Sequence, residues 1–211
     1  MPSAVIDHLV YACPNLERAI DDIAARTGVR AASGGQHPGL GTRNALLSLG
    51  PRCYLELLGP DHAQPPPAQP RPFGLDKLCG PALRGWAVAP ANLDAAIQAA
   101  RTAGTDPGQP IAGLRHGPDG TPLSWRMTPP SELNGLAIAP FLIDWDNGPH
   151  PAAQAPPGLF LADFVIRMPD PDHIIALLDS LGLTIHLQHA PAPGFRAVIN
   201  SPAGQELVLT S

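Results

Sequence analysis

The chain has 211 residues, of which 44% are hydrophobic and 15% charged, so it can bury a core of ordinary size. Its net charge of −5 and its single lysine exclude the basic patch that nucleic-acid binding requires. No apolar run is long enough for a membrane-spanning helix, and no signal peptide or disulfide framework is evident, so we expect a cytoplasmic protein with no membrane partner.

Three segments of the chain share one pattern: a short apolar run, a turn containing proline, about three turns of helix and a closing glycine. They are residues 6–28, 83–104 and 161–182. The predicted helix N-caps are Asn15, Asn92 and Asp170. The predicted closing glycines are Gly28, Gly104 and Gly182. The chain therefore contains an internal repeat.

Short strand patterns follow each predicted helix. They cover 44–49 and 53–58 in the first repeat, 123–127 and 136–143 in the second, and 184–188, 195–200 and 206–210 in the third. The interval between Gly28 and Asn44 has room for one more short strand. Each repeat therefore has the predicted order β-α-β-β-β.

Eleven of the 28 prolines lie in two stretches between the repeats, Pro60 to Pro81 and Pro149 to Pro157. Such proline-rich segments behave as stiff connectors, so we predict linkers at 61–81 and 149–158. The predicted modules are then 1–60, 82–148 and 159–211.

The tandem repeats, with a first strand IDHLVYA and a later strand YLELLG, resemble the vicinal oxygen chelate superfamily and its glyoxalase-like group. Further resemblance lies in GGQHPGLGTRN at 34–44, in PDG at 118–120 with Trp125, and in PFLIDWD at 140–146. It covers residues 4–150, and the third repeat by pattern only. The resemblance implies an α+β fold in which three tandem βαβββ modules form an open, cupped, mixed β-sheet with helices outside.

The resemblance also implies a divalent metal ion in the cup, with His8 and Glu56 at two ligand positions. An imidazole and a carboxylate suit Zn, Mn, Fe or Ni. The second repeat departs from the pattern, because Gly85 aligns with His8 and residues 141–143 align near Glu56. A third ligand would have to come from His37 or His150.

A different pairing of modules would complete the ligand set. If the first and third repeats shared a cup, the ligands would be His8, Glu56, Asp163 and Glu206. Adjacency along the chain favours the first and second repeats as partners.

The glycine-rich stretch before the second strand of the first repeat carries further candidates. His37 is a candidate general base, and Arg43 or Asn44 could hold a carboxylate or carbonyl group of a substrate. Neighbours on a strand face opposite sides, so only one of Arg43 and Asn44 should reach the cup. We predict His37, Asn44 and Glu56 as catalytic residues. The predicted substrate-binding residues are Arg43, Trp125, Trp145 and His150.

The function implied by the resemblance is that of a metal-dependent, glyoxalase-like enzyme with isomerase or lyase chemistry. Its substrate would be a small oxygenated molecule of the α-keto or α-hydroxy carbonyl type. One alternative is a protein that binds and sequesters a small molecule, as in drug resistance, without catalysis. Another is a ring-cleaving dioxygenase, although Gly85 stands where such an enzyme would carry its second histidine.

The third repeat needs a partner, because alone it would expose an apolar face and a sheet edge. We expect it to pack beside the first two repeats or to pair with its copy in another chain. The second arrangement would produce a homodimer.

Overall fold

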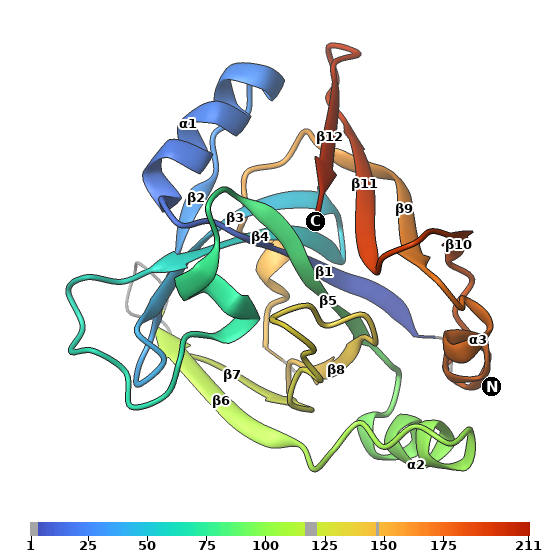
Figure 1. The fold of residues 1–211 in the computed structure, drawn as a ribbon. Helices are drawn as coiled ribbons and strands as arrows, with labels where there is room; N and C mark the ends of the chain where they lie inside the picture. Colours follow the sequence, from blue (N-terminus) through green and yellow to red (C-terminus); the bar gives the residue numbers. More distant parts are fainter. Residues whose placement is uncertain (1–3, 117–121, 147) are drawn as a thin grey trace.

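The computed structural model describes residues 4–116, 122–146 and 148–211. The β-α-β-β-β order occurs three times, so the fold is α+β as expected (Figure 1). The first repeat consists of β1 (Val5–Ala12), α1 (Leu16–Thr27), β2 (Ala32–His37), β3 (Thr42–Gly50) and β4 (Cys53–Pro60). The second consists of β5 (Ala82–Ala89), α2 (Leu93–Thr102), β6 (Ile111–His116), β7 (Pro122–Met127) and β8 (Phe141–Asp144). The third consists of β9 (Phe160–Met168), α3 (Asp172–Ser180), β10 (His186–His189), β11 (Gly194–Asn200) and β12 (Glu206–Thr210).

The first two repeats build one mixed, curled sheet with the strand order β2-β3-β4-β1-β5-β8-β7-β6. Strand β1 pairs in parallel with β4 and antiparallel with β5, which joins the two repeats at the centre. The two outer strands, β2 and β6, come together, and the buried Arg115 of β6 donates a hydrogen bond to the carbonyl of Gly34 in β2. The cup is therefore shared by the first and second repeats.

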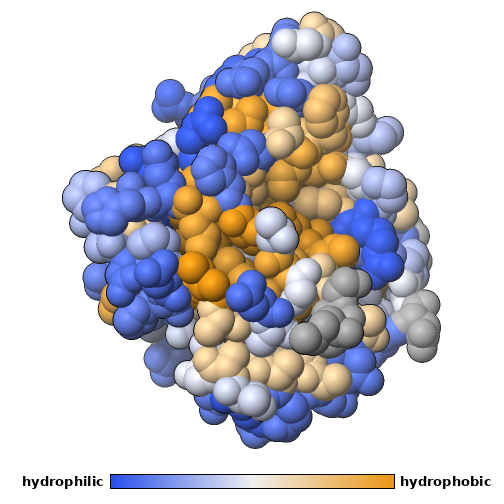
Figure 2. All heavy atoms as spheres, turned by 90° about the vertical axis from the view of Figure 1, so that its right-hand side faces the viewer, coloured by the Kyte–Doolittle hydropathy of each residue, from blue (hydrophilic) through white to orange (hydrophobic). Residues whose placement is uncertain are grey.

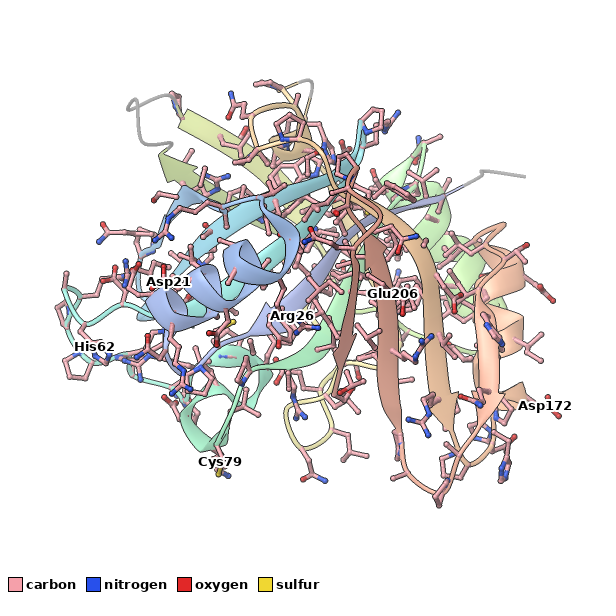
Figure 3. All side chains as sticks on the ribbon, turned by 90° about the horizontal axis from the view of Figure 1, so that it is seen from above. Asp21, Arg26, His62, Cys79, Asp172 and Glu206 are labelled. Atoms are coloured by element: carbon pink, nitrogen blue, oxygen red, sulfur yellow. The ribbon has the colours of Figure 1, made fainter. Side chains whose placement is uncertain are left out.

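The third repeat forms a separate four-stranded sheet with the order β10-β9-β11-β12. Phe164 of β9 packs 5.3 Å from the ring of Trp86 in β5, and the two belong to one hydrophobic cluster that spans all three repeats. Asp163 faces His186 and Arg196 of its own sheet. Glu206 also lies on this sheet (Figure 3). The alternative ligand set that joined the first and third repeats is therefore wrong.

The helix ends follow the predicted capping pattern, with one exception. Asn15 and Asn92 each accept a backbone N–H three residues on, and the three closing glycines have left-handed φ values of 66° to 88°. The third helix begins differently, because its N-cap is Pro171. Asp170 instead binds the Nδ1 of His173, and this contact replaces the expected cap.

The last strand of the second repeat is shorter than expected. Residues 136–143 were predicted as one strand, but β8 covers only Phe141–Asp144. Leu136 instead closes a tight turn, in which Asn134 and Gly135 adopt positive φ and Leu133 bridges to Leu136. Between this turn and β8, the backbone N–H of Ala137 donates to the carbonyl of Arg84, and Pro140 has no N–H to offer a neighbouring strand.

The proline-rich segment at 61–81 is packed against the cup. It contains the 3-10 helix η1 (Pro72–Lys77), in which Phe73 and Leu75 are buried. The guanidinium of Arg71 donates to the carbonyl of Gly41, and the backbone N–H of Phe73 donates to Glu132. The second such segment carries the 3-10 helix η2 (Pro151–Ala153), which contacts β3. The first segment therefore supplies Pro72 and Phe73 to the wall of the cup, whereas the second packs against β3 and β4.

Figure 2 shows the side of the molecule that lies at the right in Figure 1. This side is hollowed, with apolar side chains in the hollow and polar side chains around it. Within the described ranges, no helix has the length and apolar character needed to cross a membrane.

Candidate functional site

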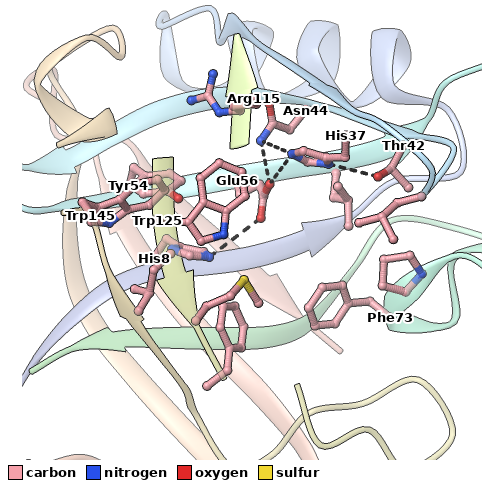
Figure 4. A pocket seen from close by; sticks show the side chains of 16 residues that line it. His8, His37, Thr42, Asn44, Tyr54, Glu56, Phe73, Arg115, Trp125 and Trp145 are labelled. Carbon is pink, nitrogen blue, oxygen red and sulfur yellow. Dashed lines mark hydrogen bonds and ion pairs between the residues drawn. The ribbon is translucent and has the colours of Figure 1, made fainter. Parts of the chain in front are cut away.

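A cavity of about 120 Å³ lies in the cup of the eight-stranded sheet (Figure 4). Alternate side chains of β4 point the same way, so Tyr54, Glu56 and Leu58 all line it. Its polar and charged lining residues are His8, His37, Thr42, Asn44, Glu56 and Arg115. Its aromatic lining residues are Tyr54, Phe73, Trp125, Phe141 and Trp145.

Glu56 lies at the centre of the polar lining and is only 9% exposed. The amide Nδ2 of Asn44 donates a hydrogen bond of 2.6 Å to Oε1 of Glu56. The Nε2 atom of His8 is 3.8 Å from Oε2, and the Nε2 atom of His37 is 3.9 Å from Oε1. The carboxylate is thus held at one oxygen and flanked by two imidazoles.

His37 is linked to Glu56 through the amide of Asn44. The Nδ2 group of Asn44 also lies 3.3 Å from Nε2 of His37, and the Nδ1 of His37 lies 3.0 Å from the hydroxyl of Thr42. We assign Nε2 of His37 as the acceptor, because the NH2 group of the Asn44 amide can only donate. Burial lowers the pKa of His37; the charge of Glu56 opposes this shift and that of Arg115 adds to it. The imidazole is therefore neutral near pH 7.

His8 and Asp7 are neighbours in β1, yet their side chains meet. The pairing of β1 with β5 shifts register between Ile6 and His8, so Asp7 is the extra residue of a β-bulge. A bulge redirects side chains that would otherwise alternate. The Nδ1 of His8 consequently lies 2.6 Å from Oδ1 of Asp7.

Asp7 is fully buried and collects three N–H groups. Besides His8, it binds Nε1 of Trp145 and Nε2 of His150, each at 2.9 Å from Oδ2. Burial opposes ionisation, but the hydrogen bonds from His150 and His8 outweigh it and hold the pKa of Asp7 well below its usual range. The ionised Asp7 therefore fixes the Nδ1–H form of His8.

The tautomer of His150 agrees with this assignment. Its Nδ1 accepts the backbone N–H of Ala152, so Nε2 carries the proton that is donated to Asp7. With Nδ1–H of His8 also directed to Asp7, the Nε2 atom of a neutral His8 presents its lone pair to the cavity beside Glu56.

The second repeat supplies no matching donors. Val10 pairs with Glu56 in the first repeat, and the aligned Ala87 pairs with Phe141, so Phe141 occupies the position of Glu56. Gly85 occupies the position of His8. A Cβ atom on Gly85 would lie 2.6 Å from the ring of Phe73, so this ring fills the space of a ligand side chain.

This donor set does not fit the expected divalent metal ion. His8 and Glu56 come from the first repeat, while the facing residues of the second repeat are aromatic or aliphatic. In the described ranges, no three His, Cys, Asp or Glu side chains form a group that could hold a metal ion. The third ligand expected at His37 or His150 is also not available, because these imidazoles bind Asn44 and Asp7.

The cavity brings together most of the residues predicted from the sequence: His8, His37, Asn44, Glu56, Trp125 and Trp145. Arg43 lies outside it and forms an ion pair of 2.8 Å with Glu17. His150 lies behind it and reaches Asp7. The motif at 118–120 falls outside the described residues.

Sequence reasoning missed several lining residues. Tyr54 could have been found, because it lies two positions before Glu56 on the same strand. Arg115 and Phe73 had no such signal, since tertiary contacts with distant strands bring them to the cavity. Burial raises the pKa of Tyr54 well above 10, with Asp7 and Glu56 adding to the effect, so the phenol stays protonated.

Comparisons with known proteins agree with this architecture. A family described as a glyoxalase-like domain matches residues 6–182. A hypothetical protein from Staphylococcus aureus has a similar structure, with a TM-score of 0.70 and 12% identity over 97% of this chain and 98% of that one. No curated protein matches the sequence.

Two methylmalonyl-CoA epimerases show a more distant similarity. The enzyme from Mycobacterium tuberculosis has a TM-score of 0.42 and 22% identity, over 70% of this chain and 91% of that one. The enzyme from Streptomyces coelicolor has a TM-score of 0.44 and 19% identity, over 70% and 97%.

Proposed function

This chain belongs to the glyoxalase-like domain family of the vicinal oxygen chelate superfamily, and from that premise we propose that it is an isomerase or lyase. It moves a proton on the carbon next to a carbonyl group of a small oxygenated substrate, such as an α-hydroxy ketone. Glu56 is the base that takes this proton.

The observation that carries the proposal is the position of Glu56. Asn44 holds one carboxylate oxygen, while the other oxygen faces His8 and the cavity. A general base must be held in place and be able to reach the proton it takes. Glu56 is also the one carboxylate in the described lining of the cavity.

The step requires no external oxidant or reductant. Glu56 takes the proton from carbon, and the electrons of the C–H bond form a carbon–carbon double bond while the carbonyl oxygen becomes an enolate. Arg115 and the protonated hydroxyl of Tyr54 line the same cavity and stabilise that charge. Return of the proton to the adjacent carbon yields the isomer, and His8 can exchange a proton between the substrate oxygens through Nε2.

A second candidate function is the binding of a small molecule without catalysis. The large aromatic share of the lining favours it, because apolar walls supply affinity in most ligand sites. Such a protein would bind an α-hydroxy ketone and leave its C–H bonds intact.

Deuterium exchange separates the two functions. We expect the wild-type protein in D₂O to exchange the α-protons of 2-hydroxyacetophenone, followed by proton NMR. Glu56→Gln keeps the shape and the contact with Asn44 but removes the base, so the rate should fall by roughly 10²- to 10⁴-fold. Glu17→Gln, which changes an exposed carboxylate outside the cavity, serves as the matched control.

Equal exchange by the wild type and Glu56→Gln would contradict the proposal. Binding of the ketone by the wild type with no exchange would favour the binding function instead.

The homodimer and the cytoplasmic location remain predictions. The third repeat buries its apolar face against the larger sheet, so this face cannot form the interface of a dimer. The proposed dimer would instead pair through an outer strand of the four-stranded sheet, β10 or β12. Light scattering of the purified protein would measure the assembly.

A further inference from the structure

The aromatic side of the cavity is a continuous arrangement of rings, of which the proposed proton transfer uses only His8 and Tyr54. Six rings follow one another around the lining: Phe73, Phe141, His8, Tyr54, Trp145 and Trp125. Successive ring centroids are 6.2, 5.3, 4.6, 6.5 and 5.6 Å apart. We call this set the aromatic arc.

Several rings of the arc are held in place by the rest of the fold. The indole N–H of Trp145 is bound to Asp7, and the ring of Phe73 rests on Gly85. Trp125 rests on Gly113, where a Cβ atom would collide with its indole. Rings fixed before binding lose little entropy when a ligand arrives. The arc is therefore a prepared surface for a flat group.

The polar lining gives the ligand a direction. Glu56 contacts Asn44 and His37, which line the cavity together with Arg115 (Figure 4). A ligand that fits this cavity has a polar, oxygenated end at Glu56 and a flat apolar end against the arc.

The size of the cavity limits the flat group to one ring. Its volume is about 120 Å³. An apolar cavity of about 150 Å³ accommodates one benzene molecule. The space in the cavity is therefore of the size of a single ring, and because the cavity is open on one side, the rest of the ligand can extend beyond it. A fused ring system would exceed this space, whereas a methyl group would leave the arc without contacts.

Charge decides between the two ligand classes that aromatic walls bind. Rings of this kind also attract quaternary ammonium groups. Here the lining carries one guanidinium, Arg115, and one carboxylate, Glu56, so its charges cancel and a quaternary ammonium group would find no net attraction. A neutral ring gains from ring-to-ring contacts at the distances that the arc offers.

We propose that the substrate is an aryl carbonyl compound, with a single aromatic ring on the aromatic arc and the carbon beside its carbonyl group at Glu56. The place of the reacting carbon rests on the proposed function, whereas the place of the ring does not.

Binding of three α-hydroxy ketones, measured by calorimetry with the full chain, tests the ring. The probes are 2-hydroxyacetophenone, its cyclohexyl analogue 1-cyclohexyl-2-hydroxyethanone, and hydroxyacetone. We expect the phenyl probe to bind roughly 2- to 10-fold more tightly than the cyclohexyl probe, because only the phenyl ring gains aromatic contacts. We expect it to bind on the order of 100-fold more tightly than hydroxyacetone.

Two variants locate the preference. Trp125→Leu keeps an apolar side chain but removes one ring of the arc, so the preference for phenyl over cyclohexyl should shrink towards 1-fold. Phe160→Leu changes an exposed ring on β9, outside the cavity, and should leave the preference unchanged. If Trp125→Leu fails to fold, Phe141→Leu provides the same comparison.

The outcomes for the ring and for the base are separate. Glu56→Gln should retain binding of the phenyl probe and lose exchange. Binding without exchange in the wild type would contradict the proposed function and still support the aryl ligand. Equal binding of the phenyl and cyclohexyl probes, or tighter binding of choline than of the phenyl probe, would overturn the aryl ligand even if exchange occurs.

Discussion

The residues that flank Glu56 depend on neighbours that do not all reach the cavity. Asp7 and His150 lie behind His8 and determine which of its nitrogens carries a proton. Asn44 does the same for His37, whose Nδ1 then faces the hydroxyl of Thr42. Because these contacts are buried hydrogen bonds, losing one partner leaves another polar group without compensation. The reactive geometry at Glu56 is therefore set by several residues together.

His37 should make stability depend on pH near neutrality. Its folded-state pKa lies below the usual value of about 6.5 because of burial, so the unfolded chain binds the proton more readily. The free energy of unfolding should therefore fall as pH drops below about 6.5, by at most about 1.4 kcal/mol per pH unit from this group. Urea unfolding of the wild type and His37→Gln between pH 7 and 5 measures this dependence.

In His37→Gln this part of the pH dependence should disappear. His189→Gln, which alters an exposed imidazole on β10, should keep the wild-type dependence. A wild-type slope that persists in His37→Gln would assign the effect to another group.

At the scale of elements, two aromatic side chains, Phe73 and Phe141, take the place of the metal ligands expected from the second repeat. We call this pair the aromatic plug. Phe73 comes from η1, a segment outside the repeated units, and covers Gly85 of β5. Phe141 of β8 replaces the carboxylate that β4 supplies at Glu56. The two halves of the cup therefore share their backbone arrangement but differ in chemistry.

Gly85→Ala tests the plug. The added Cβ would approach the Phe73 ring to 2.6 Å, so the ring must move, and we expect a loss of about 1–3 kcal/mol in the free energy of unfolding. Gly80→Ala is the matched control, because nothing lies within 4 Å of its Cβ position. In the double variant with Phe73→Leu the cost should shrink, and strictly additive effects would show that the two residues do not interact.

The sequence predicts those elements that depend on local signals. Asn15 and Asn92 cap their helices as expected, because capping involves residues three positions apart. The position of Phe73 could not be predicted, since it depends on left-handed backbone at Phe73 and Gly74 and on a hydrogen bond to Glu132. The metal centre was expected from family resemblance. It does not fit the structure, because Phe141 and the ring of Phe73 at Gly85 stand where the second repeat would supply ligands.

At the scale of the whole molecule, the third repeat completes the core of the other two. The apolar faces of α1, α2 and the four-stranded sheet belong to one cluster on the outer side of the cupped sheet. Trp86, which is fully buried, packs against Phe164 of β9 and donates its indole N–H to the carbonyl of Ile138. Elements that share a core in this way should unfold together.

The tryptophans allow this coupling to be tested, because all three lie in the second repeat, at Trp86, Trp125 and Trp145. Phe164→Ala creates a cavity in the third repeat and should cost about 3–5 kcal/mol of unfolding free energy. If the three repeats form one cooperative unit, the urea midpoint from tryptophan fluorescence should fall together with that from far-ultraviolet circular dichroism. Phe160→Leu, an exposed change on the same strand, should shift neither. A tryptophan transition unchanged in Phe164→Ala would mean that the third repeat unfolds independently and that the cup keeps its shape without it.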